Sequence, residues 1–272
     1  MGQAREGNMH VGRILLIFSI CLFPFASLAQ EEDPDFDYLE PETGFLWSWQ
    51  RFGESILRRA AHPESYEQAK RLMYNDVQDA QSLYCGCQLD LASRKFDASG
   101  CGYVPRNDNV RAHRVEAEHV VPASWLDKFH EGQSCWVKAP ECGDARNCCL
   151  ANDSRFRDAH NDLVNLVPAI GELNGDRSDL LYGEIAGEAR LYGMCDFEVD
   201  TTKSLSEPRP DVRGDIARIY FYMAQQYVLS YPESIKVMLE AWNTADPVSN
   251  LEKGRNERIR GLQGHANKFV SE

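Results

Sequence analysis

The sequence is short of basic residues, with 29 Lys and Arg against 42 Asp and Glu and a formal net charge of −13. Such a balance excludes binding of nucleic acid by overall charge attraction, because the phosphate backbone is also negative. Residues 31–42 alone hold seven acids and no base, but the remainder of the chain is acidic too. Any contact with nucleic acid must therefore use a local basic surface or a bound cation.

Long apolar stretches are also missing after the first 29 residues, which excludes a membrane-spanning helix there. Within this segment, Arg5 and Arg13 precede an apolar run over 14–25, and residues 26–29 (Ala-Ser-Leu-Ala) suit a cleavage site. This order is typical of a secretory signal peptide, whereas a membrane anchor needs roughly 20 apolar residues. We therefore expect residues 1–29 to be removed. The mature protein should be a periplasmic or extracellular monomer with no membrane attachment and no obligate protein partner.

Paired Cys-x-x-Cys spacings, which are typical of structural zinc sites, are absent as well. One of the nine cysteines, Cys21, lies in the signal segment. The other eight are Cys85, Cys87, Cys101, Cys135, Cys142, Cys148, Cys149 and Cys195. An even number in an exported chain indicates disulfide bonds, and the sequence does not choose among the 105 possible pairings. The neighbours Cys148 and Cys149 are expected to bond to different partners.

Two regions follow the signal segment. Residues 30–45 are acidic and contain two prolines, which predicts an exposed arm. Residues 46–272 are long enough for one domain with a sizeable core. No internal repeat is present in the sequence, and no low-complexity tract beyond the acidic arm.

The pattern of apolar residues predicts an α+β fold. Helical spacing runs over three ranges: 47–83, 155–166 and 214–230. Pro168 should end the second helix, and residues 174–177 (NGDR) indicate a turn. Between the helices, residues 84–125 indicate short strands and loops, and residues 133–152 a cysteine-rich loop. We therefore expect a mostly helical single domain, with a small irregular β element and disulfide cross-links.

Residues 114–122 (RVEAEHVVP) hold the main candidates for chemistry, Glu118 and His119. Alone, this pair is a weak signal, because adjacent side chains in a strand point to opposite faces. A surface ion pair or a core histidine is the alternative interpretation. For both side chains to serve one site the backbone must bend, and Pro122 fits the end of such a strand.

A second stretch, residues 162–177 (DLVNLVPAIGELNGDR), strengthens the case. Together the two stretches resemble the endonuclease I family of secreted bacterial nucleases. Its pattern is a Glu-x-Glu-His-Val-Val-Pro strand, then an Asn-Leu-x-Pro helix that runs into Glu-x-Asn-Gly-Asp-Arg. The resemblance extends from Tyr-Cys-Gly-Cys at 84–87, through Cys-Gly-Tyr at 101–103, to the C-terminal region. Two long motifs in the right order make the resemblance specific.

The resemblance implies a ββα-metal site, also called a His-metal finger. In it His119 would be the general base, Glu118 and Asn165 the metal ligands, and Arg146 the arginine that holds the scissile phosphate. Extra residues around Cys148-Cys149 leave the alignment of Arg146 open. The family often carries Trp where this chain has Ala117, and His or another aromatic residue in place of Val164. Neither position supplies a ligand atom, so altered packing or substrate contact is expected there.

The implied activity is sequence-nonspecific endonuclease cleavage of DNA and RNA that leaves 5′-phosphates. The chemistry suits these residue types independently. Neutral imidazole titrates near working pH and can accept a proton. Mg²⁺, for which Mn²⁺ or Ca²⁺ could substitute, prefers oxygen ligands and keeps several waters, and arginine offers a planar fork to phosphate. An inactive binding module of the same fold and a zinc hydrolase are the alternatives, but the sequence shows no ligand triplet for catalytic zinc.

Local basic residues address the acidity of the chain. Arg106, Arg111 and Arg114 fall in a segment that is near neutral overall. With Arg146 and Arg177 they are predicted to form one cationic face that binds nucleic acid; scattered solvated charge is the alternative. Four other histidines are not assigned to the site. His113 and His160 are interpreted as surface residues, and His62 and His265 have no partner in the sequence.

Overall fold

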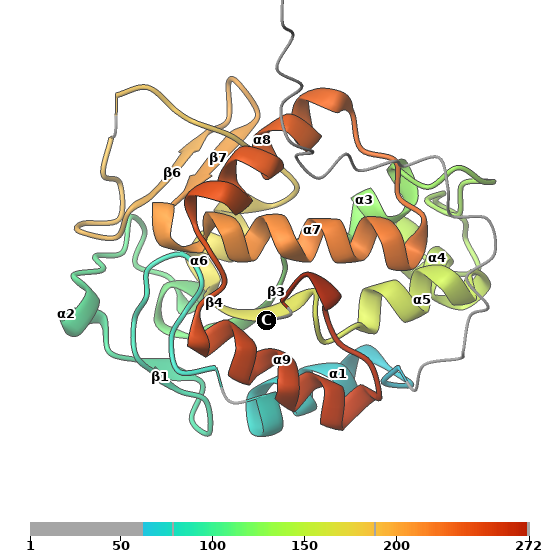
Figure 1. The fold of residues 1–272 in the computed structure, drawn as a ribbon, viewed down its shortest axis with the longest axis horizontal. Coiled ribbons are helices and arrows are strands. Elements are labelled where there is room, and N and C mark those ends of the chain that lie inside the picture. Colours follow the sequence, from blue (N-terminus) through green and yellow to red (C-terminus); the bar gives the residue numbers. More distant parts are fainter. Residues whose placement is uncertain (1–61, 78, 188, 271–272) are drawn as a thin grey trace, which may run out of the picture. The chain divides into compact units, whose positions relative to one another are not determined.

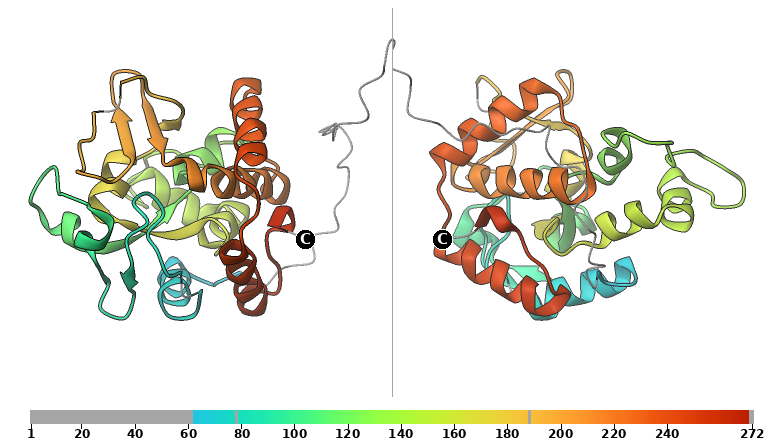
Figure 2. Two further views of the ribbon diagram at one scale, coloured as in Figure 1. Left: turned by 60° about the vertical axis from the view of Figure 1, so that its left-hand side comes forward. Right: turned by 45° about the vertical axis from the view of Figure 1, so that its right-hand side comes forward.

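The computed structural model describes residues 62–77, 79–187 and 189–270. The expected signal peptide, the acidic arm and the helical pattern before residue 62 therefore lie outside the described residues. Within these ranges the chain combines helices with small sheets, as Figures 1 and 2 show. The prediction of a mostly helical α+β domain is confirmed. No helix of the described ranges is long and apolar enough to cross a membrane.

The helices are distributed along the whole described chain. They are α1 (Tyr66–Leu72), α2 (Ala98–Cys101), α3 (Ala123–Lys128), α4 (Ala145–Asn152), α5 (Ser154–Asn161), α6 (Gly171–Arg177), α7 (Arg213–Tyr227), α8 (Glu233–Ala245) and α9 (Asn250–Gln263). A π-helical turn, Met73–Val77, continues α1 directly. Shorter 3₁₀ turns cover Val110–His113, Pro210–Val212 and Lys268–Val270.

The strands form three small sheets within the described ranges. Their bounds are β1 (Leu89–Asp90), β2 (Lys95–Phe96), β3 (Val115–His119), β4 (Leu166–Ile170), β5 (Leu181–Tyr182), β6 (Phe197–Asp200) and β7 (Leu205–Pro208). Strands β1 and β2 pair antiparallel, as do β3 and β4. In the third sheet, β7 lies between β5, to which it is parallel, and β6, to which it is antiparallel.

The β3–β4 pair carries the first candidate motif. Its register joins Val115 to Ile170 at one end and His119 to Leu166 at the other. All five residues of β4 are buried, so the pair lies inside the domain rather than on its surface. In Figure 1 the pair is drawn between α7 and α9. The sequence motif at 114–122 thus ends at a buried strand terminus, where polar side chains are costly unless they are hydrogen-bonded.

The helix predicted over 155–166 is too long. Helix α5 ends at Asn161, and residues 166–170 form strand β4 instead. A short apolar run is compatible with a helix or a strand. Residues 166–170 are buried on both faces of the strand, and such burial favours β-structure. Pro168 lies inside this strand, opposite Ala117. A proline is tolerated there because β4 has only one partner strand, so its other edge does not need a backbone N–H donor.

Two loop predictions also differ from the structure. The turn expected at 174–177 is the end of helix α6, and the cysteine-rich segment contains helix α4. Both helices begin after residues with extended backbone, Ile170 and Asp144. In α4 the Asp144 side chain accepts a hydrogen bond from the Asn147 amide at 2.8 Å and caps the helix. By contrast, α7 (Arg213–Tyr227) matches the helix predicted over 214–230 to within one residue at its start and three at its end.

The eight described cysteines form four disulfides. The pairs are Cys85–Cys195, Cys87–Cys101, Cys135–Cys149 and Cys142–Cys148. The prediction that Cys148 and Cys149 take different partners is confirmed. Two of the bonds reach helix α4 and fix it to the loop that precedes it.

These disulfides should contribute unequally to stability. Cys85 and Cys195 are 110 residues apart, whereas Cys142 and Cys148 are six apart. The chain-entropy model gives about 4.8 and about 2.2 kcal/mol respectively. We therefore expect the Cys85→Ser/Cys195→Ser variant to lose more unfolding free energy in guanidinium titration than Cys142→Ser/Cys148→Ser. Equal losses would contradict the loop-length argument.

Candidate active site

The end of strand β3 is held by the side chain of Asn165. The Val120 amide donates to the Asn165 carbonyl oxygen at 3.0 Å, which extends the strand ladder by one step. The Asn165 amide then pairs with the backbone of Val121. Its Oδ1 accepts from the Val121 N–H at 2.7 Å, and its Nδ2 donates to the Val121 oxygen at 3.0 Å. This fixes the chain where it leaves the strand, before Pro122 and α3.

His119, the last residue of β3, is fixed in one tautomer. Its Nε2 lies 2.8 Å from the carbonyl oxygen of His160. A carbonyl can only accept, so Nε2 carries the hydrogen and the neutral ring has its lone pair on Nδ1. Within the described residues Nδ1 has no hydrogen-bond partner. The imidazole therefore presents a proton-accepting nitrogen in a defined orientation.

Two aromatic rings pack on His119. The Tyr66 ring is stacked at 5.4 Å between centroids, and the His160 ring is tilted at 4.4 Å. Burial holds the pKa of His119 well below its ordinary value; the charge that His160 carries when protonated, in acid, and the charge of Arg146 lower it further. The ring is consequently neutral over the physiological range, which is the form that a general base requires.

His160 is buried, whereas the sequence interpretation placed it on the surface. The side chain is 0% exposed, and its Nδ1 lies 3.2 Å from the Asn161 Oδ1. The Asn161 Nδ2 donates to the Pro63 oxygen, so Oδ1 is the acceptor toward His160. Burial lowers the pKa of His160 to about 4. A neutral ring thus stands beside His119 and adds no repelling charge there.

Glu118 is a buried carboxylate with two donors on one oxygen. Its Oε1 accepts from the Tyr84 hydroxyl at 2.6 Å and from Arg177 Nη1 at 3.0 Å. Within the described residues Oε2 accepts no hydrogen bond. Burial raises the pKa of Glu118, and the nearby Arg177 and Tyr84 oppose this rise. A further cation near Oε2 would favour the ionised form.

Arg177, from the end of α6, is fully buried beneath this strand end. Besides Glu118, its Nη1 donates to the His119 carbonyl at 2.9 Å, and Nη2 donates to the Val120 carbonyl at 2.6 Å. The guanidinium also lies over the Tyr182 ring, 4.5 Å from its centroid. With 0% of its surface exposed, Arg177 differs from the expected surface contact to nucleic acid. Its contacts tie the Glu118 carboxylate to the backbone at His119.

The three candidate residues are close along the β3–β4 pair, but their hydrogen bonds go to separate partners. Glu118 bonds to Tyr84 and Arg177, His119 to the His160 carbonyl, and Asn165 to Val121. The bend expected at Glu118 and His119 is not found there, because both residues continue strand β3 and pair in register with Val167 and Leu166 of β4. The chain bends only after them, at Val120 and Val121, where the Asn165 side-chain amide pairs with the Val121 backbone. Asn165 itself immediately precedes strand β4, not a helix as the motif suggested.

Arg146 is an exposed residue in the first turn of α4. Its charge lowers the pKa values of His119, His160 and Tyr66, which places it on the imidazole side of the strand end. The disulfides Cys135–Cys149 and Cys142–Cys148 secure its helix. The structure therefore places the charge of Arg146 near His119. This observation holds whether or not Arg146 aligns with the arginine of the family motif.

The arginines expected to form a cationic face are half-exposed and paired with acids. Arg106 bonds to Asp176 at 2.7 Å. Arg111 and Arg114 both bond to Glu116, at 2.6 and 2.5 Å. Each acid offsets part of the positive charge, so the cationic face stays a prediction.

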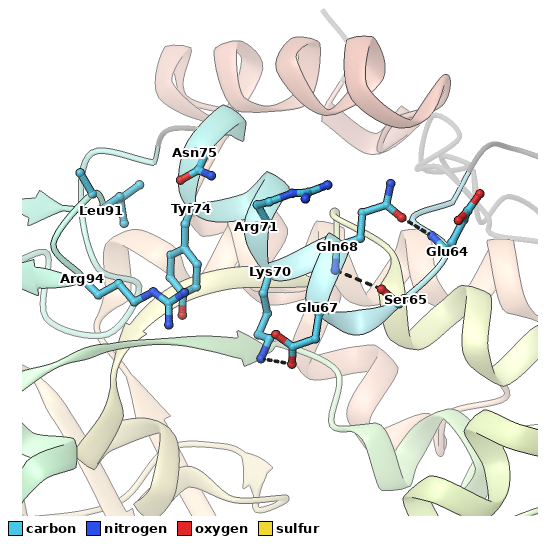
Figure 3. A pocket seen from close by; sticks show the side chains of 11 residues that line it. Glu64, Ser65, Glu67, Gln68, Lys70, Arg71, Tyr74, Asn75, Leu91 and Arg94 are labelled. Carbon is cyan, nitrogen blue, oxygen red and sulfur yellow. Dashed lines mark hydrogen bonds and ion pairs between the residues drawn. The ribbon is translucent and has the colours of Figure 1, made fainter.

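A cleft that the sequence did not reveal lies beside α1 (Figure 3). It has a volume of about 650 Å³ and is lined by α1 and the π-helical turn on one side and by Leu91 and Arg94 on the other. Lys70 lies over the Tyr66 ring, 4.7 Å from its centroid, and Tyr66 stacks on His119. Lys70, which lines the cleft, is thus connected through the Tyr66 ring to the candidate base, although Tyr66 and His119 do not line the cleft themselves. The cleft lining includes the exposed cation Arg71. The sequence predicted only that Arg71 lies in a helix and gave it no functional role.

Similarity to known proteins identifies this disulfide-bonded α+β domain as a hydrolytic enzyme of the nuclease class. More closely, the chain belongs to the endonuclease I family, because the family model described as Endonuclease I matches residues 54–272. Endonuclease-1 of Buchnera aphidicola is 37% identical over 210 residues, which cover 76% of this chain and 80% of that protein.

Two relatives from Aeromonas hydrophila are similarly close. A periplasmic deoxyribonuclease is 38% identical over 192 residues, covering 70% of this chain and 77% of its own length. An extracellular deoxyribonuclease is 37% identical over 213 residues, covering 77% and 90%. The similarity therefore spans most of the domain rather than the two motifs alone.

Proposed function

We propose that this chain is an exported, sequence-nonspecific endonuclease that hydrolyses the phosphodiester bonds of DNA and RNA and leaves 5′-phosphates. The observation that carries this proposal is the fixed tautomer of His119. Its Nε2–H is held by the His160 carbonyl, so Nδ1 is free to take a proton from water. The water oxygen attacks phosphorus, and the bond to the 3′ oxygen breaks.

The proton that His119 accepts produces an imidazolium. The Nε2–H bond to the His160 carbonyl strengthens when the ring becomes charged, because charge-assisted hydrogen bonds are stronger than neutral ones. The neutral ring of His160 adds no like charge beside it. Before the reaction, the low pKa of His119 keeps its ring neutral. When the ring takes the proton from water, the hydrogen bond to the His160 carbonyl stabilises the charged form.

The donor set fits a hard divalent cation. Glu118 would contribute Oε2, since its Oε1 already accepts two hydrogen bonds. Asn165 Oδ1 accepts one hydrogen bond, from Val121, which leaves its second lone pair for a cation. Mg²⁺ prefers such oxygen ligands and keeps several waters. When bound, the cation would offset negative charge on the phosphate and the leaving oxygen.

Two arginines take different parts in this proposal. Arg146 is exposed beside His119 and would bind a phosphate oxygen with its planar fork. Arg177 is a positioning residue, because it contacts Glu118 and the His119 carbonyl from the buried side. The charge that faces substrate therefore comes from α4, and the charge that holds the strand end comes from α6.

Removal of divalent cations should abolish cleavage. Protein treated with EDTA and desalted is expected to leave a plasmid intact, and added Mg²⁺ should restore cleavage because the phosphate charge is again offset. Mn²⁺ and Ca²⁺ are tested in parallel, with plasmid and a structured RNA as substrates. If no cation restored cleavage while plasmid was still retained in a binding assay, the chain would be a binding module instead. If chelated protein cut at the original rate, the cation would have no part in the reaction.

The cleft beside α1 is proposed to guide one strand of nucleic acid toward His119. Replacing Arg71 and Arg94 by Glu should weaken DNA binding and reduce the salt slope by about 1 for each lost phosphate contact. The matched control is the Arg111→Glu/Arg114→Glu variant, whose native charges are already paired with Glu116. Binding is measured over a range of salt concentrations with a catalytically impaired background. A larger effect of the control pair would favour the cationic face over the cleft.

Export of the chain agrees with this function. The predicted signal segment and the four disulfides both indicate an oxidising compartment. The Aeromonas relatives are named as periplasmic and extracellular enzymes. We therefore place the enzyme outside the cytoplasm.

A further inference from the structure

A second group of ligand-type side chains lies outside the strand end. His62, Asp162 and His265 come from the segment before α1, the end of α5 and the segment after α9. Their candidate ligand atoms all lie within 4.8 Å of one another. Asp162 Oδ2 is 3.5 Å from His265 Nε2 and 3.9 Å from His62 Nδ1. Three parts of the chain that are distant in sequence thus meet at one carboxylate.

Asp162 is a fully buried carboxylate with neutral hydrogen-bond donors. Its Oδ2 accepts from the hydroxyls of Tyr222 at 2.7 Å and Tyr227 at 2.6 Å. Its Oδ1 accepts from Gln263 Nε2 at 2.8 Å and from the Val164 amide at 2.9 Å. None of these donors carries a charge, and a buried ion without a counter-charge is costly. The adjacent groups able to provide or hold a positive charge are the two imidazoles.

The tautomer of His265 points a lone pair at this carboxylate. Its Nδ1 lies 2.9 Å from the Gln263 carbonyl, so Nδ1 carries the hydrogen. The Gln263 amide is oriented by its Oε1, which accepts from the Leu163 N–H, and its Nε2 therefore donates toward His265 Nε2 at 3.1 Å. In the neutral ring, Nε2 is then a lone pair that faces Asp162. That lone pair accepts from Gln263 Nε2, so a metal ion between His265 and Asp162 would displace the Gln263 donor.

We propose that His62, Asp162 and His265 bind one Zn²⁺ ion, separate from the catalytic cation. Two imidazole nitrogens and a carboxylate oxygen form a three-ligand zinc set, with the fourth position left to water. Zinc ligands at about 2.1 Å in tetrahedral geometry are roughly 3.4 Å apart, close to the 3.5 and 3.9 Å that separate the histidine nitrogens from Oδ2. Tyr227, whose hydroxyl is 3.4 Å from both His62 nitrogens, would give up its place on Oδ2.

The ion would stabilise the segment that leads into the catalytic strand. Asp162 precedes Asn165 by three residues, and the intervening Leu163 and Val164 amides bond to Gln263 and Asp162. Fixing Asp162 to His62 and His265 would join this segment to both ends of the described domain. The ion would lie apart from the cleaved bond, and its loss would act through the position of Asn165.

Zinc titration of metal-stripped protein by calorimetry tests this inference. The Glu118→Gln background removes the proposed catalytic ligand, and the described cysteines, all in disulfides, offer no thiol to compete. We expect one Zn²⁺ per molecule in this background. Replacing His265 by Asn, or His62 by Ala, should weaken binding more than about 100-fold, beyond the usual effect of an outer-shell residue. His113→Ala, an exposed histidine, is the matched control and should bind as the parent does.

Two readouts separate zinc binding from misfolding and from failure of the nuclease proposal. Zinc at about 100 times its Kd should raise the Tm of the parent by about 5 °C or more, and Co²⁺ should give the visible bands of a four-coordinate site. Circular dichroism checks that each variant folds. Absence of zinc uptake and of a Tm shift in the parent would overturn the inference, as would equal affinities of the His265→Asn and His113→Ala variants. Neither outcome depends on whether the protein cuts DNA.

Discussion

Replacing His119 by Ala is expected to lower the rate of plasmid cleavage by about 10²- to 10⁴-fold, the usual contribution of a general base. The imidazole has no substitute at this position, because the neighbouring His160 Nε2 is buried and its Nδ1 bonds to Asn161. Affinity for DNA should change little, since the neutral ring contributes no charge. Rates are measured by plasmid relaxation under single-turnover conditions, with affinity measured separately.

The control for this variant is His113→Ala, which removes an exposed histidine paired with Asp108. It should cleave at the original rate. Added imidazole should restore part of the activity of His119→Ala, because a free base can occupy the vacated volume and take the proton. Wild-type cleavage by His119→Ala would show that another group activates water. Loss of activity together with loss of the folded state would point instead to a packing role beside Tyr66.

Replacing Arg177 by Met should be the most destabilising single change considered. Arg177 donates to Glu118 and to the carbonyls of His119 and Val120 while fully buried. Removing one partner of a buried ion pair costs about 3–5 kcal/mol, because the remaining charge and acceptors stay buried without their donor. For a domain of this size the loss corresponds to a Tm decrease of roughly 10 °C or more. Calorimetric scans of the variant and the parent measure it.

Arg111→Met is the matched control, since it breaks an exposed pair with Glu116 that should contribute at most about 1 kcal/mol. A double variant that also carries Glu118→Gln should recover part of the stability lost in Arg177→Met, because the uncompensated charge is removed. No recovery would mean that the two backbone carbonyls, rather than the carboxylate, account for the loss. Equal Tm decreases for Arg177→Met and Arg111→Met would contradict the buried arrangement.

The parts of the fold that the sequence predicted are those with strong local patterns. Helix α7 follows from apolar spacing over 214–230, and its three tyrosines are buried in the core. The even number of cysteines indicated disulfides, and adjacency alone separated the partners of Cys148 and Cys149. The bend expected at Glu118 and His119 is an exception, because pairing with β4 keeps both residues in a regular strand.

Other features depend on contacts between distant segments, which local patterns do not contain. The 155–166 pattern allowed a helix, but Leu166–Ile170 is buried on both faces and pairs with β3. His160 and Arg177 are polar residues in ordinary surface contexts along the sequence. Their burial is set by neighbours such as Tyr66 and Glu118, more than 50 residues away. The same holds for Asp162, whose histidine neighbours lie about 100 residues to either side.

Helix α4 has a consequence for when the enzyme becomes competent. Arg146 stands on a helix whose position is secured by Cys135–Cys149 and Cys142–Cys148, and such bonds do not persist in the reducing cytoplasm. A newly synthesised chain would therefore lack the anchored helix that carries Arg146, the proposed phosphate contact, while it shares a compartment with the chromosome. If Arg146 binds phosphate as proposed, oxidation after export would complete the enzyme only away from the genome of the producing cell.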